Sequence, residues 1–450
     1  MPLVAFHTLG CKVNHYETEA IWQIFRKHGY ERGDFEKTAD VYVINTCTVT
    51  NTGDQKSRQV IRRAIRRNPD AVICVTGCYA QTSPAEVMSI PGVDIVIGTQ
   101  NRRKLLGYID RFRKQREPIN GVGDIMKAKV FEELDVPSFT DRTRASLKIQ
   151  EGCNKFCTFC VIPWARGLLR SRKPENVIRQ AQELVDAGYK EIVLTGIHTA
   201  GYGEDMEDYN FAALLRDLEK NVRGLKRLRI SSIEASQITD EVVHVIHRSH
   251  VIARHLHIPL QSGSDTVLKR MHRTYTTAFF ADKIKNLREA LPDFALTSDV
   301  IVGFPGETEE EFMETYRFIR ELRFAELHVF PYSQRTGTPA ARMPDQVPEN
   351  VKHDRVSRLI ALSNRLSSQY ARGYQNHVLE VIPEEPYRHH EPNGTYVGFS
   401  DNYLKVRFSY PSPDIVGKLV RVKLTHADYP VSEGTFVRML DEDEQPMTTF

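Results

Sequence analysis

Short apolar runs alternate with amphipathic stretches in the N-terminal part of the chain. The apolar runs at 3–8, 41–45 and 71–76 predict strands, and a helical spacing of apolar positions predicts helices at 17–28 and 55–67. Strands and helices that alternate in this way are typical of a parallel sheet. We therefore predict a parallel α/β domain at 1–114.

Further strand-like runs follow in the central part of the chain, separated by helical patterns. Parallel strands with intervening helices predict an open or partial (βα)6 barrel, which we place at 139–369. Active sites in barrels of this kind lie at the carboxyl ends of the strands. The predicted strands lie near 146–150, 191–195, 227–231, 255–259, 295–302 and 326–330.

The pattern changes again near the C-terminus, where short runs alternate apolar and polar residues. The strings are HVLEVIP, GTYVGFS, YLKVRFS, KLVRVKL and TFVRML, with turn residues between them. Short strands in this arrangement predict a small, OB-like β-barrel, a fold that often binds oligonucleotides. We place this barrel at 372–442. The fold class is therefore α/β, with a C-terminal β-barrel.

The composition is that of an ordinary globular chain. Of 450 residues, 41% are hydrophobic and 26% charged, and no apolar run reaches the length of a membrane span. The first residues also lack the basic and apolar segments of a signal peptide. We expect a cytoplasmic protein with no membrane partner, whose 7 cysteines are reduced and used for metal binding or catalysis.

Three cysteines form a C-x3-C-x2-C spacing in the string EGCNKFCTFC: Cys153, Cys157 and Cys160. A loop this tight brings three thiolates to one metal centre. A structural zinc normally takes four protein ligands, whereas an iron–sulfur cluster held by three thiolates keeps one iron open for a small chelating ligand. We therefore predict an iron–sulfur cluster, with zinc and a distant fourth ligand as the alternative.

Three other cysteines each follow a predicted strand of the first domain. Cys11 lies in HTLGCKVN, Cys47 in INTCTVT and Cys78 in VTGCYAQ. The carboxyl ends of parallel strands share one edge of a sheet, so these thiols are expected to converge there. We predict a second three-thiolate cluster at this edge, with three unrelated loop thiols as the alternative. Cys74 lies inside the apolar string VICV and is expected to be a buried core residue.

A C-x3-C-x2-C loop at the mouth of a partial barrel resembles the radical S-adenosylmethionine (SAM) superfamily. The resemblance implies that the open iron chelates the amino and carboxylate groups of SAM. An electron from the cluster then cleaves SAM to a 5′-deoxyadenosyl radical, which abstracts a hydrogen atom. A reducing electron donor is therefore an expected partner.

Polar residues at the ends of the barrel strands are candidates for the SAM contacts. Glu234, Gln261 and Ser298 lie at or near the carboxyl ends of predicted strands. The resemblance adds Phe159, expected against the adenine, and Gly196, expected near the SAM amino group. Helix caps and tight turns are the structural alternative for such residues.

The strings EGCNKFCTFCVIPWARGLLRSR and HIPLQSGSDTVLKRMHRTYT, with the N-terminal trio and the C-terminal barrel, resemble the methylthiotransferase family. The family carries two [4Fe–4S] clusters, and its pattern matches Cys11, Cys47 and Cys78 for the first cluster and the C-x3-C-x2-C trio for the second. Its C-terminal TRAM domain binds RNA. The family inserts a methylated sulfur into a C–H bond and uses two molecules of SAM.

Two strings near the N-terminal cysteines indicate the substrate. HTLGCKVNHYETEA and NTCTVTNTGDQKSRQ resemble the branch that modifies N6-threonylcarbamoyladenosine at position 37 of tRNA. The branches acting on isopentenyladenosine or on a ribosomal-protein aspartate are the alternatives, and a non-enzymatic iron–sulfur RNA-binding or redox-sensing protein is an alternative of another class. We expect no DNA partner.

The net charge of +3 is too small to establish an RNA partner alone, but the basic residues are clustered. We expect these clusters to supply phosphate contacts, with a solvated helix face as the alternative for the first of them. The first lies on a predicted helix, the second after the C-x3-C-x2-C loop and the third on the C-terminal strands. Their members are Arg62, Arg63, Arg66 and Arg67; Arg166, Arg170, Arg172 and Lys173; and Lys405, Arg407, Lys418, Arg421 and Lys423.

Overall fold

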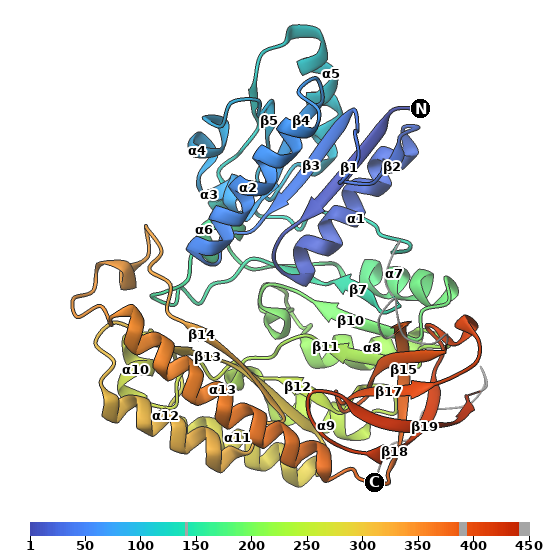
Figure 1. The fold of residues 1–450 in the computed structure, drawn as a ribbon, viewed down its shortest axis with the longest axis vertical. Helices are drawn as coiled ribbons and strands as arrows, with labels where there is room; N and C mark the ends of the chain where they lie inside the picture. Colours follow the sequence, from blue (N-terminus) through green and yellow to red (C-terminus); the bar gives the residue numbers. More distant parts are fainter. Residues whose placement is uncertain (140–142, 387–393, 441–450) are drawn as a thin grey trace. The chain divides into compact units, whose positions relative to one another are not determined.

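The structure is a computed structural model that describes residues 1–139, 143–386 and 394–440 (Figure 1). The chain forms two compact units. Unit 1 consists of Met1–Thr140, Lys148–Arg172 and Ser333–Arg342, and unit 2 consists of Asp141–Leu147, Lys173–Tyr332 and Met343–Phe450. The segment with the C-x3-C-x2-C cysteines therefore belongs to the same compact unit as the N-terminal sheet.

The sheet of unit 1 has the strand order β2-β1-β3-β4-β5-β6, and all its pairs are parallel. The three predicted strands are confirmed as β1 (Leu3–Thr8), β3 (Val41–Thr46) and β4 (Val72–Gly77). The sequence pattern did not indicate the remaining strands, because they contain only two or three residues: β2 (Glu31–Gly33), β5 (Ile95–Val96) and β6 (Ile119–Asn120).

Both faces of this sheet are covered, and for that reason the central strands β3 and β4 are buried along their whole length. In β3, Tyr42 and Ile44 join the apolar cluster that contains Ile61 of α2 (Asn51–Arg67). Val41 and Val43 join the opposite cluster, which contains Phe25 of α1 (Lys12–Lys27). The other helices between the strands of this sheet are α3 (Cys78–Thr82), α4 (Pro84–Met88) and α5 (Leu105–Gln115).

The six predicted central strands are confirmed and form two three-stranded sheets, β11-β10-β7 and β12-β13-β14. A bridge between Leu228 and Ile252 adds a parallel contact beside β11. The strands are β7 (Ala145–Lys148), β10 (Glu191–Thr195), β11 (Arg227–Ile230), β12 (His255–His257), β13 (Ala295–Val302) and β14 (Glu326–Pro331). The longer helices among and after them are α7 (Pro174–Asp186), α8 (Phe211–Asn221), α9 (Asp240–Arg248), α11 (Thr277–Ala290), α12 (Glu309–Leu322) and α13 (Glu349–Arg372).

The C-terminal strands close into a barrel with the order β15-β16-β17-β19-β18, as the alternating pattern predicted. An apolar cluster that includes Val381, Val406 and Val422 fills it. The strands are β15 (Val378–Pro386), β16 (Thr395–Ser400), β17 (Lys405–Ser409), β18 (Val420–His426) and β19 (Ser432–Met439). Among the helices that the structure describes, none is both long and apolar enough to cross a membrane.

Buried arginines of the central strands form hydrogen bonds with this barrel. Arg229 of β11 donates to the carbonyls of Ser400 (2.9 Å) and Asp401 (3.0 Å), and Arg227 donates to that of Glu380 (2.9 Å). The fully buried Glu191 carboxylate lies 2.7 Å from the Arg229 guanidinium. Burial alone would raise the pKa of Glu191, but the neighbouring arginines lower it to about 2. The carboxylate therefore stays ionised and holds both arginines toward the barrel.

Candidate functional site

The N-terminal cysteines lie at the carboxyl ends of three adjacent strands. Cys11 precedes the first residue of α1 as its N-cap, Cys47 directly follows β3, and Cys78 begins α3 directly after β4. The Cys11 and Cys47 thiols lie near enough to Cys78 that a charge on either would raise its pKa. The structure thus brings together three thiols that are widely separated in the sequence, as the strand–turn–cysteine pattern implied.

The backbone around these thiols is shaped to leave room for them. Gly10 has φ +103°, and a Cβ on it would lie 2.9 Å from the Cβ and 3.0 Å from the Sγ of Cys47. Cys11 is exposed, Cys47 half-buried and Cys78 buried. Burial raises the pKa of Cys78 to about 12, although the Arg166 guanidinium opposes this rise. A metal centre that binds here must therefore displace the Cys78 proton, as thiolate ligation requires. The donor set of three clustered thiols fits an iron–sulfur cluster with one open iron.

The C-x3-C-x2-C loop is fixed by its own backbone and by a distant segment of unit 1. The amide of Cys153 donates to the carbonyl of Gly167 (3.0 Å), and that of Cys160 donates to the carbonyl of Cys157 (3.0 Å). Ala340, from the segment Ser333–Arg342, donates to the carbonyl of Thr158 (2.9 Å). Cys157 is buried and the other two thiols are half-buried. Backbone hydrogen bonds thus fix the conformation of this loop.

The arginines after this loop are buried, which contradicts the prediction that they contact phosphates. Arg166 and Arg172 have no exposed surface and Arg170 has 2%. Arg172 lies 2.7 Å from Glu133 and 2.9 Å from Asp135, so its charge is already paired. The sequence pattern showed a basic run, but it did not show the acidic partners that neutralise it.

The polar residues predicted to contact SAM lie in unit 2, except Phe159, which is half-buried in the cysteine loop of unit 1. Glu234 forms an ion pair with Arg273, and its other oxygen lies 3.6 Å from Nε2 of His198. Gly196 directly follows β10 and is half-buried. Glu234 and Gly196 thus follow neighbouring strands of one sheet.

Gln261 and Ser298 are structurally linked. Gln261 has a positive φ of 67°, and its backbone bonds to Asp299 and Ile301 of β13 at 2.9 and 2.8 Å. The fully buried Ser298 hydroxyl donates to the carbonyl of Ile258 (2.8 Å) and accepts from the amide of Leu260 (2.9 Å). Ser298 therefore holds the loop in which Gln261 adopts its strained conformation.

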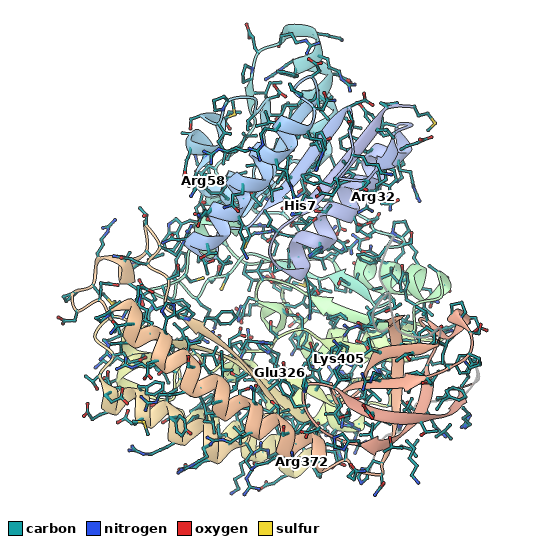
Figure 2. The ribbon with its side chains drawn as sticks, in the orientation of Figure 1. His7, Arg32, Arg58, Glu326, Arg372 and Lys405 are labelled. Carbon is teal, nitrogen blue, oxygen red and sulfur yellow. The ribbon has the colours of Figure 1, made fainter. Side chains whose placement is uncertain are left out.

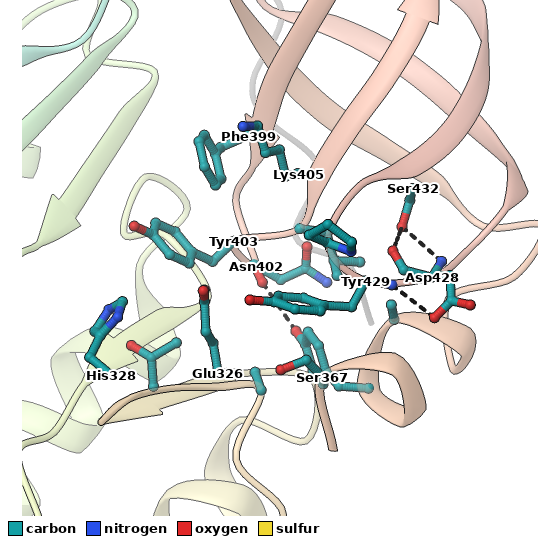
Figure 3. Close-up of a pocket in the computed structure, with 16 residues that line it drawn as sticks. Glu326, His328, Ser367, Phe399, Asn402, Tyr403, Lys405, Asp428, Tyr429 and Ser432 are labelled. Atoms are coloured by element: carbon teal, nitrogen blue, oxygen red, sulfur yellow. Dashed lines mark hydrogen bonds between the residues drawn. The ribbon is translucent and has the colours of Figure 1, made fainter. Parts of the chain in front are cut away.

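Unit 2 also contains a cavity of about 290 Å³, between strands β13 and β14 and helix α13 on one side and the C-terminal barrel on the other (Figure 3). Glu326, His328 and Lys405 line it together with aromatic side chains, and Figure 2 locates Glu326 and Lys405 in the chain. The Tyr403 ring stacks on His255 (4.0 Å between centroids) and on Phe399 (5.0 Å), so its faces are already covered.

One imidazole at this cavity belongs to a small polar cluster. Nδ1 or Nε2 of His257 and His328 and a carboxylate oxygen of Asp299 lie within 4.8 Å of one another. His257 Nε2 is 3.3 Å from Asp299 Oδ2, and its Nδ1 is 3.0 Å from the Thr297 hydroxyl. These three side chains come from three neighbouring strands, a grouping that the sequence pattern did not indicate.

Two protein-family models match the chain. The model described as the Radical SAM superfamily matches residues 147–319, and the one described as Uncharacterized protein family UPF0004 matches residues 3–98. Each match contains one cysteine trio. The second match thus corresponds to the parallel sheet of unit 1.

Among solved structures, the radical S-adenosylmethionine methyltransferase TsrM from Kitasatospora setae, with cobalamin and a [4Fe–4S] cluster bound, resembles the chain. The TM-score is 0.58 at 14% sequence identity, over 75% of this chain and 77% of that one. At this level of identity, the likeness concerns the fold alone. It agrees with the α/β architecture described above.

Curated relatives match almost the whole chain. The threonylcarbamoyladenosine tRNA methylthiotransferase MtaB of Bacillus subtilis is 72% identical over 98% of both chains. The enzyme of the same name from Aquifex aeolicus is 40% identical over 93% of this chain, and the tRNA-2-methylthio-N(6)-dimethylallyladenosine synthase of Carboxydothermus hydrogenoformans is 36% identical over 96%. The chain therefore belongs to the radical SAM methylthiotransferase family and, within it, to the branch of the MtaB enzymes.

Proposed function

We propose that this protein methylthiolates C2 of N6-threonylcarbamoyladenosine at position 37 of tRNA. The observation that carries the proposal is the 72% identity to the Bacillus subtilis enzyme over 98% of both chains. The identity falls to 36% with a relative named for the dimethylallyladenosine reaction. The sequence is thus far closer to relatives named for the threonylcarbamoyl substrate.

Two [4Fe–4S] clusters and SAM are the proposed cofactors. Cys11, Cys47 and Cys78 would hold one cluster, and Cys153, Cys157 and Cys160 the other. When bound, these groups supply a 5′-deoxyadenosyl radical, a methyl group and a site for the transferred sulfur. The grouped thiols and Gly10, where a Cβ would crowd Cys47, support the first assignment, and the backbone bonds of the cysteine loop support the second.

The protein's own part is to bind and orient these groups. Phe159 is proposed to pack on the adenine of SAM, and Gly196, Glu234 and Gln261 to border the rest of the cofactor. Ser298 is proposed to act by fixing the loop that carries Gln261, since its hydroxyl already has two backbone partners. A reducing electron donor is a proposed partner, and the cytoplasm is the proposed compartment because tRNA is modified there.

The C-terminal barrel is proposed as a TRAM-like RNA-binding domain. RNA loops present unstacked bases, which proteins recognise with basic groups and aromatic rings. Basic and aromatic side chains line the cavity of Figure 3. Lys405 is half-buried there, and its amine lies over the Phe399 ring, 6.0 Å from the centroid. An ammonium group at this position suits a phosphate or carboxylate of the substrate.

The experiment is a reaction of the reconstituted enzyme with two tRNAs. One carries threonylcarbamoyladenosine and the other isopentenyladenosine at position 37, and the nucleosides are analysed by mass spectrometry after addition of SAM and a reductant. The proposal predicts a methylthio product from the first tRNA only. A product from the second alone would assign the chain to the other branch, and cluster-containing protein inactive on both would favour a different substrate or a non-enzymatic role.

A further inference from the structure

Arg166, which ends the short helix α6 (Ile162–Arg166) after the C-x3-C-x2-C loop, has no exposed surface. Burial of a guanidinium group costs several kcal/mol, on the order of the effective penalty for any ion, unless partners compensate it. The groups that compensate the buried charge therefore indicate the structural role of Arg166. They come from three separate segments of unit 1.

Each nitrogen of the Arg166 guanidinium has at least one acceptor. Its Nε donates to the sulfur of Cys78 at 3.1 Å. Its Nη1 donates to Glu17 at 2.6 Å and to Glu151 at 3.3 Å, and its Nη2 donates to the side-chain oxygen of Asn14. Asn14 and Glu17 lie on α1, the helix that Cys11 caps. One side chain thus joins the surroundings of Cys11 to the sulfur of Cys78.

The acidic partners of Arg166 are shared with other cations. Glu17, fully buried, also lies 2.8 Å from Arg102 and 2.7 Å from Lys148. Lys148 contacts Glu151 as well. Arg102 also lies 2.7 Å from Glu132, so three carboxylates balance three cations in this network, while the Nε–H of Arg166 is directed at the sulfur of Cys78. A negative charge on Cys78 is therefore stabilised at this position.

We infer that Arg166 is a positioning residue for the Cys78 ligand of the N-terminal cluster and raises the reduction potential of that cluster. The inference rests on the proposed cluster assignment. An N–H group that donates to a ligand sulfur, and a positive charge in a buried site, both favour the reduced state, which carries one more electron. The same loop that carries the radical SAM cysteines thereby supplies a hydrogen bond to the other cluster.

The matched control is Arg102, which is equally buried and binds the same Glu17. No described contact joins Arg102 to a cysteine sulfur, so Arg102→Gln removes a buried cation from the network but leaves the Arg166–Cys78 hydrogen bond. Arg166→Gln removes both the charge and the planar set of guanidinium N–H donors. Arg166→Lys keeps the charge but lacks that planar set of donors.

The experiment uses the full-length chain with Cys153, Cys157 and Cys160 replaced by Ala, so that only the N-terminal cluster assembles. Iron per chain is measured first, and the midpoint potential is then followed by electron paramagnetic resonance. Arg166→Gln should shift the ratio of reduced to oxidised cluster about tenfold toward the oxidised form, which is about 59 mV for a one-electron couple. Arg166→Lys should shift it less, and Arg102→Gln less than Arg166→Gln.

The inference is overturned if Arg166→Gln keeps full iron content and the parental potential, or if Arg102→Gln produces an equal shift. If Arg166→Gln folds but loses its iron while Arg102→Gln retains it, the positioning role is supported; equal loss in both assigns the effect to the network as a whole and overturns it. A parent protein that binds no iron would instead refute the proposed cluster assignment itself.

Discussion

The guanidinium of Arg335 donates a hydrogen bond of 2.6 Å to the hydroxyl of Thr48, although 287 residues separate the two in the sequence. The same guanidinium lies 2.7 Å from Asp54 and 2.6 Å from the side-chain oxygen of Asn51. All three partners lie in the loop after Cys47 or in the first turn of α2. The segment Ser333–Arg342 thus braces the backbone that presents Cys47.

Arg335→Ala should therefore loosen this loop and lower the iron retained by the N-terminal trio. Loss of one partner from a buried ion pair costs about 3 kcal/mol, because the other charge is left uncompensated. The measurement is iron per chain after gel filtration, together with thermal unfolding. Arg342→Ala, at an exposed position of the same segment, is the control and should behave like the parent. Equal iron retention in both variants would contradict the bracing role.

Replacement of single cysteines should separate the two proposed clusters. Cys157→Ala should abolish SAM cleavage, because the loop would lose one of its three thiolates. Cys47→Ala should preserve part of that cleavage but stop methylthiolation of tRNA. The readouts are 5′-deoxyadenosine and methylthio nucleoside from the same reaction. Cleavage retained in Cys157→Ala, or full methylthiolation by Cys47→Ala, would exclude the corresponding role.

Protonation of Glu191 should make unit 2 less stable in acid. Its pKa is lowered from the ordinary value of 4.5 to about 2, because the attraction of the arginines outweighs burial. Its contribution is therefore fully present above the unfolded pKa and is lost as the pH falls through about 4.5 toward 2. Glu191→Gln should be destabilised by about 3 kcal/mol at neutral pH, since it leaves buried arginines unpaired.

Thermal unfolding at several pH values measures this contribution. The difference between the parent and Glu191→Gln should shrink as the pH falls below the unfolded pKa. Glu289→Gln is the control, because this exposed carboxylate lies 3.9 Å from Lys285 and has no buried partner in its ion pair. A difference that does not depend on pH would show that Glu191 acts through packing alone.

Lys405 should contribute to tRNA binding through charge. Lys405→Ala should weaken binding and reduce the slope of log K against log salt by about 0.7, the value for one phosphate contact in a single strand. Lys283→Ala on α11 serves as the comparison, and filter binding over a range of salt concentrations gives both slopes. An affinity that falls with an unchanged slope would argue for a shape effect at the cavity instead.

The placement of the three N-terminal cysteines could be predicted because it follows from strand periodicity. The cysteines after β1, β3 and β4 had to share an edge once the sheet was parallel, and the three thiols do converge there. The C-terminal barrel followed in the same way from alternating apolar and polar positions. Period and turn residues are local signals, so the sequence displays them directly.

The charge network around Arg166 could not be predicted for the opposite reason. Its contact with Glu17 joins residues 149 positions apart, and no periodic pattern relates them. In the sequence, Arg166, Arg170 and Arg172 form a basic run that favours a surface role, yet all three are buried. Pairing between distant buried charges depends on the packed structure, which a linear pattern does not contain.

The most direct test of the proposed function is the nucleoside content of tRNA from cells that lack this protein. Mass spectrometry should show loss of 2-methylthio-N6-threonylcarbamoyladenosine and accumulation of N6-threonylcarbamoyladenosine. The parent gene should restore the product, and a gene encoding Cys157→Ala should not. An unchanged level of the methylthio nucleoside in the deleted cells would contradict the proposed reaction.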